Sequence, residues 1–173
     1  MSAPMTRRDF STRIAALGAG IGVTTIPATA LAVGQVSRTA ESIHEEVVIP
    51  ATSKRVYQAL TDARQFTKVT TFSPVMNAAP AHIDRDVGGG FVLFGGHIIG
   101  RHVELVPFRR IVQAWRVVDW DPGIYSIVKF DLTDQGHQTT IVFDHTGFPN
   151  GKADHLADGW RLNYWKPLEK YFG

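Results

Sequence analysis

Cysteine is absent from the sequence, which excludes disulfide bonds, a thiolate nucleophile and thiolate-ligated metal sites. A hydrophobic run that could span a membrane is also missing, because the modest apolar stretch over residues 14–26 is short and interrupted by glycines. No internal repeat and no low-complexity tract occurs. The 173 residues are enough for one well-buried domain and too few for two ordinary ones.

The main part of the sequence has no excess of either charge. Three of the 18 basic residues and one of the 16 acidic residues lie within residues 1–32, so the formal net charge of +2 comes from that segment. The remaining charges are mixed in sign and sum to zero. A neutral domain of this kind lacks the basic surface that a phosphate backbone requires, so we expect no nucleic-acid partner.

Sequence motifs of catalysis and cofactor binding are missing as well. No H-E-x-x-H zinc motif, G-x-S-x-G elbow, G-x-G-x-x-G turn or P-loop occurs. Among the seven histidines, His97 and His102 fall in one predicted strand, but a spacing of five puts them on opposite faces. Asp144 and His145 are adjacent and also face opposite ways. We therefore predict no metal, no cofactor and no catalytic residue set.

The first 32 residues have the pattern of an export signal. Arg7 and Arg8 are followed by Phe10, a modest apolar stretch and small residues that fit a small-x-small cleavage rule. This segment resembles a twin-arginine (Tat) signal peptide. We predict a signal peptide over residues 1–32, a polar linker over 33–42 and a periplasmic protein. The alternative is an ordinary N-terminal tail on a cytoplasmic protein.

The remaining chain, residues 43–173, alternates between strand and helix signals. A strand is expected over 43–50, which ends at a proline, and Thr52 and Ser53 offer an N-cap for a short helix. Residues 63–70 favour a second short helix, and residues 71–82 an irregular loop. Short Gly/Asp turns join five further strands at 91–94, 97–107, 111–118, 124–132 and 138–148, with a seventh strand possible in 79–86.

Alternation along these strands predicts one apolar and one wetter sheet face. The apolar face is expected to carry His97, Arg101, Val103, Leu105, Trp115, Ser126, Val128, Phe130, Leu132, Ile141, Phe143 and His145. For the strand of Trp115 both faces are apolar, and we choose the Trp115 face as inward. Such a sheet needs one large cover, which indicates an α+β fold: a curved antiparallel sheet of six or seven strands around one long helix.

Residues 154–172 supply that helix. Its large apolar residues recur at helical spacing and form an aromatic stripe: Leu156, Trp160, Tyr164, Leu168 and Tyr171. Pro167 lies inside the helix and has no amide proton for the carbonyl of Asn163, so we predict a kink there. The half before the kink should face any pocket, and the last turn should seal the core.

Four strings occur in order along residues 43–173: GGGF, FGGHIIGRHVELVPFRRIVQAWRV, HTGFP and DGWRLNYWKPLEKYF. Together they resemble the C-terminal domain of activators of heat shock protein 90 ATPase, within the START-like (SRPBCC) superfamily. The resemblance implies a helix-grip fold and the superfamily habit of enclosing a hydrophobic pocket. It also implies a chaperone or other protein partner as one alternative.

The favoured hypothesis is a non-enzymatic exported protein that binds a small hydrophobic or amphipathic molecule between sheet and helix. The expected ligand-binding residues are Phe91, Arg101, Val103, Trp115, Phe130, Phe143, His145, Trp160 and Tyr164. A charged group such as Arg101 in an apolar pocket is suited to a ligand carboxylate or phenolate, unless it lies near the sheet edge and reaches water. One alternative is a cyclase- or hydrolase-like enzyme that uses Arg101 or His145. The other is a chaperone-partner module with an exposed patch on the convex sheet face.

Overall fold

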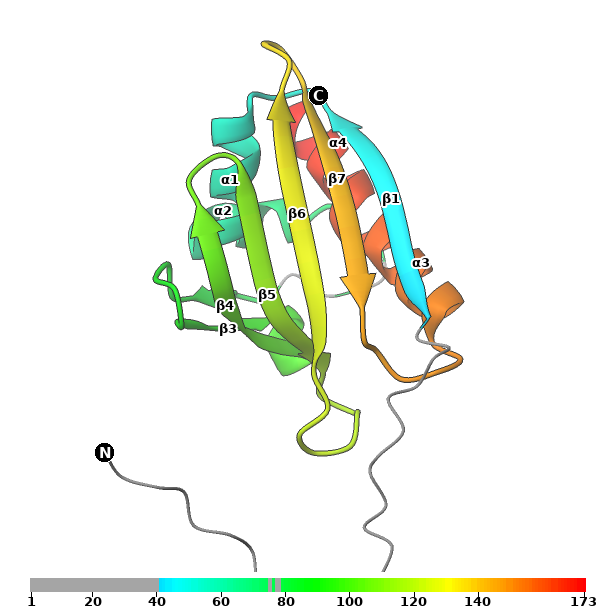
Figure 1. Ribbon diagram of the computed structural model, residues 1–173. Coiled ribbons are helices and arrows are strands. Elements are labelled where there is room, and N and C mark those ends of the chain that lie inside the picture. Colours follow the sequence, from blue (N-terminus) through cyan, green and yellow to red (C-terminus); the bar gives the residue numbers. More distant parts are fainter. Residues whose placement is uncertain (1–40, 75, 77–78) are drawn as a thin grey trace, which may run out of the picture. The chain divides into compact units, whose positions relative to one another are not determined.

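The computed structural model describes residues 41–74, 76 and 79–173, so the predicted signal peptide and most of the predicted linker lie outside the described residues. In the described part, seven antiparallel strands form one sheet in the order β1-β7-β6-β5-β4-β3-β2. Helices α1 to α4 lie on one side of this sheet (Figure 1). The predicted α+β helix-grip architecture is therefore confirmed.

The strands occupy the predicted segments. They are β1 (Ser42–Ile49), β2 (His82–Ile83), β3 (Gly90–Leu93), β4 (Ile98–Val106), β5 (Arg110–Val117), β6 (Ser126–Asp134) and β7 (Thr139–Thr146). A 3₁₀ turn, η1 (Phe94–Gly96), joins β3 to β4. The two-residue β2 is the seventh strand expected within residues 79–86. Between β6 and β7, Gly136 adopts a φ of 84°, which a glycine reaches without steric strain in a tight turn.

A bulge in β4 changes which of its side chains face the helices. His102 pairs with Gln113 and Glu104 pairs with Val112, so Val103 is an extra residue between them. His102 is consequently 1% exposed, whereas Val103 is 50% exposed and Arg101 is exposed. The prediction that Arg101 and Val103 point inward is wrong, because simple alternation traced along β4 does not hold across a bulge.

Two short helices follow β1 at the predicted positions, α1 (Ser53–Thr61) and α2 (Ala63–Thr70). Asp62 separates them and caps α2, because its carboxylate accepts hydrogen bonds from the backbone N–H groups of Arg64 and Gln65. Each helix packs one apolar face into the core, through Val56, Ala59, Leu60, Phe66 and Val69. Because Asp62 alone separates α1 from α2, the chain turns sharply there and both helices lie beside the C-terminal helix.

The C-terminal helix is built from α3 (Ala153–Trp160), a π-helical turn η2 (Arg161–Trp165) and α4 (Lys166–Phe172). The backbone N–H of Lys166 bonds to the carbonyl of Arg161, five residues back. The wider turn ends just before Pro167, which lies in the first turn of α4, where a missing N–H is tolerated. A π-helical turn thus precedes Pro167, and the kink itself stays a prediction.

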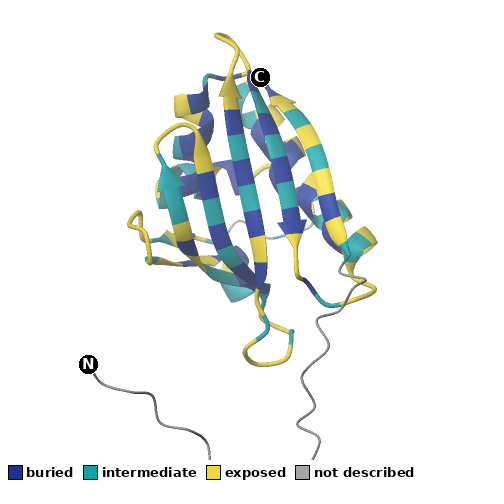
Figure 2. Cartoon of the chain, viewed as in Figure 1, coloured by how far each residue is buried: buried dark blue, intermediate teal, exposed yellow. Residues whose placement is uncertain are grey.

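The core lies between the sheet and the helices and is rich in aromatic rings. Buried and exposed residues alternate along the central strands (Figure 2). The ring of Trp160 lies 4.5 Å from that of Phe143 and 5.9 Å from that of Phe130, measured between centroids. The predicted inward orientation is confirmed for Trp115, Ser126, Val128, Phe130, Leu132, Ile141, Phe143 and His145, all of which are buried.

Candidate functional site

A small cavity, here called the inner chamber, lies under the first half of the C-terminal helix. Its volume is about 50 Å³, and its walls include Phe94, Ile98, Trp115, Leu156, Trp160 and Tyr164. One water molecule occupies about 30 Å³ in the liquid, so the inner chamber holds a group of only two or three heavy atoms. As predicted, Trp160 and Tyr164 from the first half of the helix face this space.

A wider depression, here called the vestibule, adjoins the inner chamber. Its volume is about 330 Å³, and Trp120 and Ile124 contribute to its walls. The two spaces share His97, Val117 and His155, together with Leu156. Small-molecule sites usually measure about 300–1,000 Å³, so the two spaces together reach the lower end of that range.

Two buried polar groups in the inner chamber make no hydrogen bond within the described residues: Trp115 Nε1 and the Tyr164 hydroxyl. Trp115 is 3% exposed and Tyr164 is 6% exposed. The other two buried indoles are bonded, since Trp160 Nε1 donates to His145 Nδ1 and Trp165 Nε1 donates to Glu45. Burial raises the pKa of Tyr164 far above its usual value, and the nearby Trp115 indole offsets only part of this rise. Tyr164 is therefore a neutral donor at physiological pH.

His145 is buried beneath Trp160, and both of its ring nitrogens are bonded. Nδ1 lies 3.0 Å from Trp160 Nε1, and Nε2 lies 2.7 Å from Ser126 Oγ. Because an indole N–H can only donate, Nδ1 accepts and Nε2 donates to Ser126, whose hydroxyl donates to the carbonyl of Trp115. Burial lowers the pKa of His145 to about 3, so the ring is neutral. His145 therefore orients Trp160 and has no nitrogen left for a ligand.

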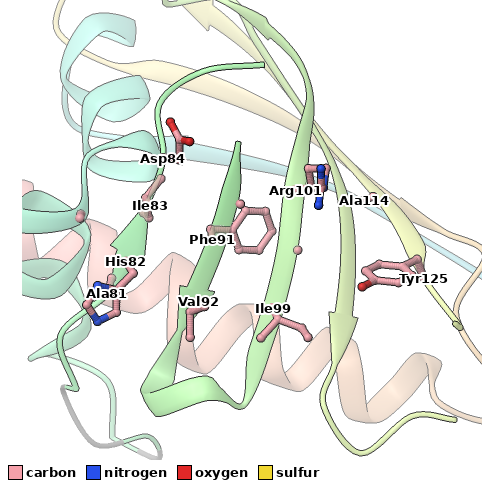
Figure 3. A pocket seen from close by; sticks show the side chains of 13 residues that line it. Ala81, His82, Ile83, Asp84, Phe91, Val92, Ile99, Arg101, Ala114 and Tyr125 are labelled. Carbon is pink, nitrogen blue, oxygen red and sulfur yellow. The ribbon is translucent and has the colours of Figure 1, made fainter. Parts of the chain in front are cut away.

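A third depression, here called the outer groove, lies over β2 to β5 and has a volume of about 930 Å³. Figure 3 shows the side chains that line it, among them Val92, Ile99 and Tyr125 beside Arg101. Val92 is 39% exposed and Tyr125 is 48% exposed. Within the described residues Arg101 makes no ion pair, so its cation is available to a partner.

The sequence profile of the family described as "Activator of Hsp90 ATPase homolog 1-like protein" matches residues 50–173. The chain belongs to this family. Its curated relatives include the "Activator of 90 kDa heat shock protein ATPase homolog 1" of Homo sapiens, 27% identical over 117 residues, which are 66% of this chain and 35% of the relative. The "Hsp90 co-chaperone AHA1" of Saccharomyces cerevisiae is 24% identical over 134 residues, 76% of this chain and 37% of the relative. The chain thus spans about a third of the length of the curated relatives it matches.

One solved structure of a family relative and one of a more distant protein share the fold of this chain. An HSP90 activator from Plasmodium falciparum has a TM-score of 0.68 and 26% identity, with 75% of this chain and 94% of that chain covered. CalU16 from Micromonospora echinospora has a TM-score of 0.62 at 21% identity, with 78% and 77% covered, and shows the fold alone. The family resemblance of the four sequence strings is thus confirmed.

The structure distributes the nine predicted ligand-binding residues of this family member over several settings. Trp115, Trp160 and Tyr164 line the inner chamber, whereas Phe91 and Arg101 line the outer groove. Phe130, Phe143 and His145 are buried in the core, and Val103 is exposed on the outer face. Three of the nine residues therefore come together where the sequence hypothesis placed a pocket.

The two groups named for the enzyme alternative do not come together. Arg101 is exposed on the outer sheet face, and His145 is buried on the inner face with both nitrogens bonded. They cannot act on one substrate atom in this arrangement. Among the described residues, no three histidine or acidic side chains gather to hold a metal ion, and none of the helices has the length and apolarity for a membrane crossing.

Sequence reasoning missed Gly159 and Asn163 as lining residues of the inner chamber. Asn163 is 4% exposed, donates to the carbonyl of Gly159 and accepts a hydrogen bond from Ser73 Oγ. The available signal was helical spacing, since these residues lie four apart on one face. Phe94 and Met76 carried no such signal, because they lie in a turn and a loop.

His102 is a buried residue that sequence reasoning placed on the outer face of the sheet. Within the part of the chain that the structure describes, neither of its ring nitrogens has a hydrogen-bond partner, and its ring lies 5.5 Å from that of Phe91. Burial lowers the pKa of His102, and the negative charge of Asp84 opposes this in part. The neutral ring thus acts as a packing group in the core.

Proposed function

We propose that the protein is a non-enzymatic member of its family that binds a small hydrophobic or amphipathic molecule between the sheet and the C-terminal helix. The supporting observation is the inner chamber, which adjoins the vestibule and contains two buried donors without acceptors. The apolar body of the ligand would lie in the vestibule against Val117, Trp120 and Ile124. Its end would enter the inner chamber.

Simple core packing does not account for the inner chamber as well as a ligand does. An unsatisfied buried donor costs about 1–3 kcal/mol, and native cores contain few of them. Here two such donors line the same cavity, on different elements, β5 and η2. A ligand acceptor would remove this cost, whereas side-chain packing alone leaves it in place.

Native mass spectrometry of protein purified from its own host, followed by thermal-shift assays with lipids and aromatic compounds, tests this function. We expect a bound mass and a rise in Tm. Gly159→Leu is the matched variant, because a Cβ at Gly159 meets no atom within 4 Å and the longer side chain would fill the chamber. The same Tm response in wild type and Gly159→Leu, or no bound mass and no response in either, would contradict the proposal.

Export by the Tat route is a further part of the proposed function. It rests on Arg7, Arg8 and Phe10, which lie outside the described residues. Fractionation of cells that express the full chain tests it: the protein should appear in the periplasm, and the double substitution Arg7→Lys with Arg8→Lys should retain it in the cytoplasm. Equal distribution of both proteins would oppose export.

A second candidate function is docking to a protein partner through the outer groove. Relatives are named as activators or co-chaperones of Hsp90. The outer groove combines exposed apolar side chains with the free cation of Arg101, which suits a partner segment with apolar side chains and one carboxylate. We take a heat shock protein 90-type chaperone as the partner in this alternative.

A binding assay with the purified host chaperone separates this candidate from the first. Arg101→Glu should weaken binding at least tenfold, since it reverses the cation of the groove and leaves Asp84 as a second, like charge. His137→Glu, in the exposed turn between β6 and β7, is the control and should bind as wild type. Absence of chaperone binding by the wild type would exclude this alternative.

A further inference from the structure

We propose that the inner chamber recognises an uncharged, carbonyl-type oxygen at one end of an otherwise apolar ligand, held jointly by Trp115 Nε1–H and the Tyr164 O–H. This inference rests on the proposed small-molecule function and specifies its ligand. The two side chains come from β5 and from the π-helical turn η2, and both line the chamber.

The chemistry of the two groups requires an acceptor. An indole N–H can only donate, and a neutral phenol has one proton to donate. Neither group forms a hydrogen bond of normal geometry among the described residues. The Trp115 indole N–H lies close enough to the Tyr164 oxygen to lower the pKa of the phenol as a donor, but it offers the phenol proton no acceptor. Even if the indole N–H reached the phenol oxygen, the phenol proton would still lack an acceptor. A ligand that brings an oxygen lone pair satisfies the pair, whereas a second donor does not.

The lining of the chamber indicates that this oxygen is uncharged. None of the residues that line the chamber is Lys, Arg, Asp or Glu. A buried carboxylate or phenolate without a cation is strongly disfavoured. His97 and His155 lie where the chamber meets the vestibule, and His155 is exposed to solvent. The inner end of the chamber therefore suits a ketone, ester or amide oxygen.

Size limits what can enter the chamber beside the oxygen. About 50 Å³ accommodates a carbonyl group with one small substituent. The rest of the ligand must therefore lie in the vestibule, where the ring of Trp120 packs 5.7 Å from that of Trp115. An apolar or aromatic body with a terminal carbonyl matches the chamber and the apolar wall of the vestibule. The other walls of the vestibule include the exposed side chains of Asp119, Asp121 and Lys152.

The donor pair is held in place by packing, so that little ordering is required on binding. The Trp160 ring packs against both, 5.5 Å from Trp115 and 4.2 Å from Tyr164 by centroid. Trp160 is itself fixed by the hydrogen bond to His145. His145 and Trp160 are thus positioning residues for the two donors.

Indole N–H spectra of the ¹⁵N-labelled full chain test the inference. The four tryptophans give four indole signals, and Trp115→Phe identifies that of Trp115. The probes are acetophenone, ethylbenzene as the matched compound without oxygen, and benzoate as the charged one. We expect acetophenone to move the Trp115 signal and to bind about tenfold more tightly than ethylbenzene, the effect of one good hydrogen bond.

Two tyrosine variants provide a matched control. Tyr164→Phe should remove the preference for acetophenone, while Tyr171→Phe, on the last turn of the same helix and outside the chamber, should retain it. Equal binding of ethylbenzene with an unmoved Trp115 signal would overturn oxygen recognition and leave the proposed function standing. Tighter binding of benzoate would overturn the uncharged character. If no probe moves any indole signal up to its solubility limit, oxygen recognition fails, while the native mass spectrum of the protein from its own host decides the proposed function separately.

Discussion

At the residue scale, the buried polar side chains differ in whether the fold supplies their partners. Both ring nitrogens of His145 form hydrogen bonds within the protein, and so do the amide oxygen and nitrogen of Asn163. Trp115 Nε1 and the Tyr164 hydroxyl are similarly buried but find no acceptor among residues 41–74, 76 and 79–173. Fully bonded groups stabilise one arrangement of the core, whereas unbonded donors that share a cavity offer a place for an acceptor from outside.

The titration of His145 predicts a pH-dependent stability. Its folded pKa of about 3 lies below the ordinary value of 6.5, so the unfolded chain binds the extra proton. The stability from this group is complete above pH 6.5 and falls as the pH drops toward 3, by about 2 kcal/mol between pH 7.5 and 5. Urea unfolding at these two pH values should show a smaller difference for His145→Gln than for wild type.

His137→Gln is the control, because His137 lies in an exposed turn and should leave the pH dependence unchanged. His102 contributes in the same direction as His145, since burial also lowers its pKa. Some acid sensitivity therefore remains in His145→Gln. If the stability of His145→Gln depends on pH as strongly as that of the wild type, His145 is not the titrating group.

Replacing glycine by alanine should have opposite effects on stability at Gly100 and at Gly159. A Cβ at Gly100 would lie 2.2 Å from the Phe91 ring and 2.4 Å from the Ala114 carbonyl oxygen, so Gly100→Ala should destabilise the protein by about 2–3 kcal/mol. A Cβ at Gly159 meets no atom within 4 Å, and Gly159→Ala in α3 should stabilise it by about 0.5–1 kcal/mol. Chemical denaturation measures the free energy of unfolding of both variants. Equal changes in the two variants would contradict the close packing described at Gly100.

At the element scale, β4 shows where sequence patterns stop being sufficient. Its span and partners follow from its composition and flanking turns, and both were predicted. The bulge at Val103 was not, because an extra residue in one strand is defined only by the partner strand that it fails to pair with. Arg101 and His102 were consequently assigned to the wrong faces.

The N-terminus of α3 depends on a residue far away in the sequence. The Glu41 carboxylate accepts hydrogen bonds from the backbone N–H groups of Gly151 and Ala153, at 2.9 and 3.3 Å. Lys152 at the N-cap position provides no side-chain bond. Glu41→Ala should therefore destabilise the protein by about 1 kcal/mol, through loss of a cap and of a negative charge near the helix dipole.

Thermal unfolding of Glu41→Ala beside Glu46→Ala measures this contribution. Glu46 lies on the exposed face of β1, five residues further along, and its removal should change stability little. Similar losses in the two variants would show that the carboxylate of Glu41 does not stabilise α3.

At the scale of the whole molecule, the sheet separates a packed inner face from an outer face available to partners. Adjacent residues of β6 show this: Val128 is 0% exposed and Ile127 is 44% exposed. Val128→Ala should cost about 2 kcal/mol, whereas Ile127→Thr should stay within about 0.5 kcal/mol. Urea unfolding of both variants tests whether Val128 faces the core and Ile127 faces outward. A large loss of stability in Ile127→Thr would contradict this orientation.

The sequence by itself determined the fold class, the order of the elements and the inward faces of β6 and β7, whereas both faces of β5 are apolar in sequence. These features depend on local composition and on a period of two or 3.6 residues, which any continuous stretch of sequence carries. It also placed Trp160 and Tyr164 toward a space under the helix, because helical spacing defines a face.

Only the tertiary structure decided how large that space is and which donors in it lack partners. Cavity volume depends on the fit between side chains from distant segments, and a hydrogen bond depends on where its partner lies. Trp160 finds His145 and Trp165 finds Glu45, while Trp115 and Tyr164 find no acceptor. That difference is invisible in four similar aromatic residues along a sequence, and it is the basis for the function that we propose.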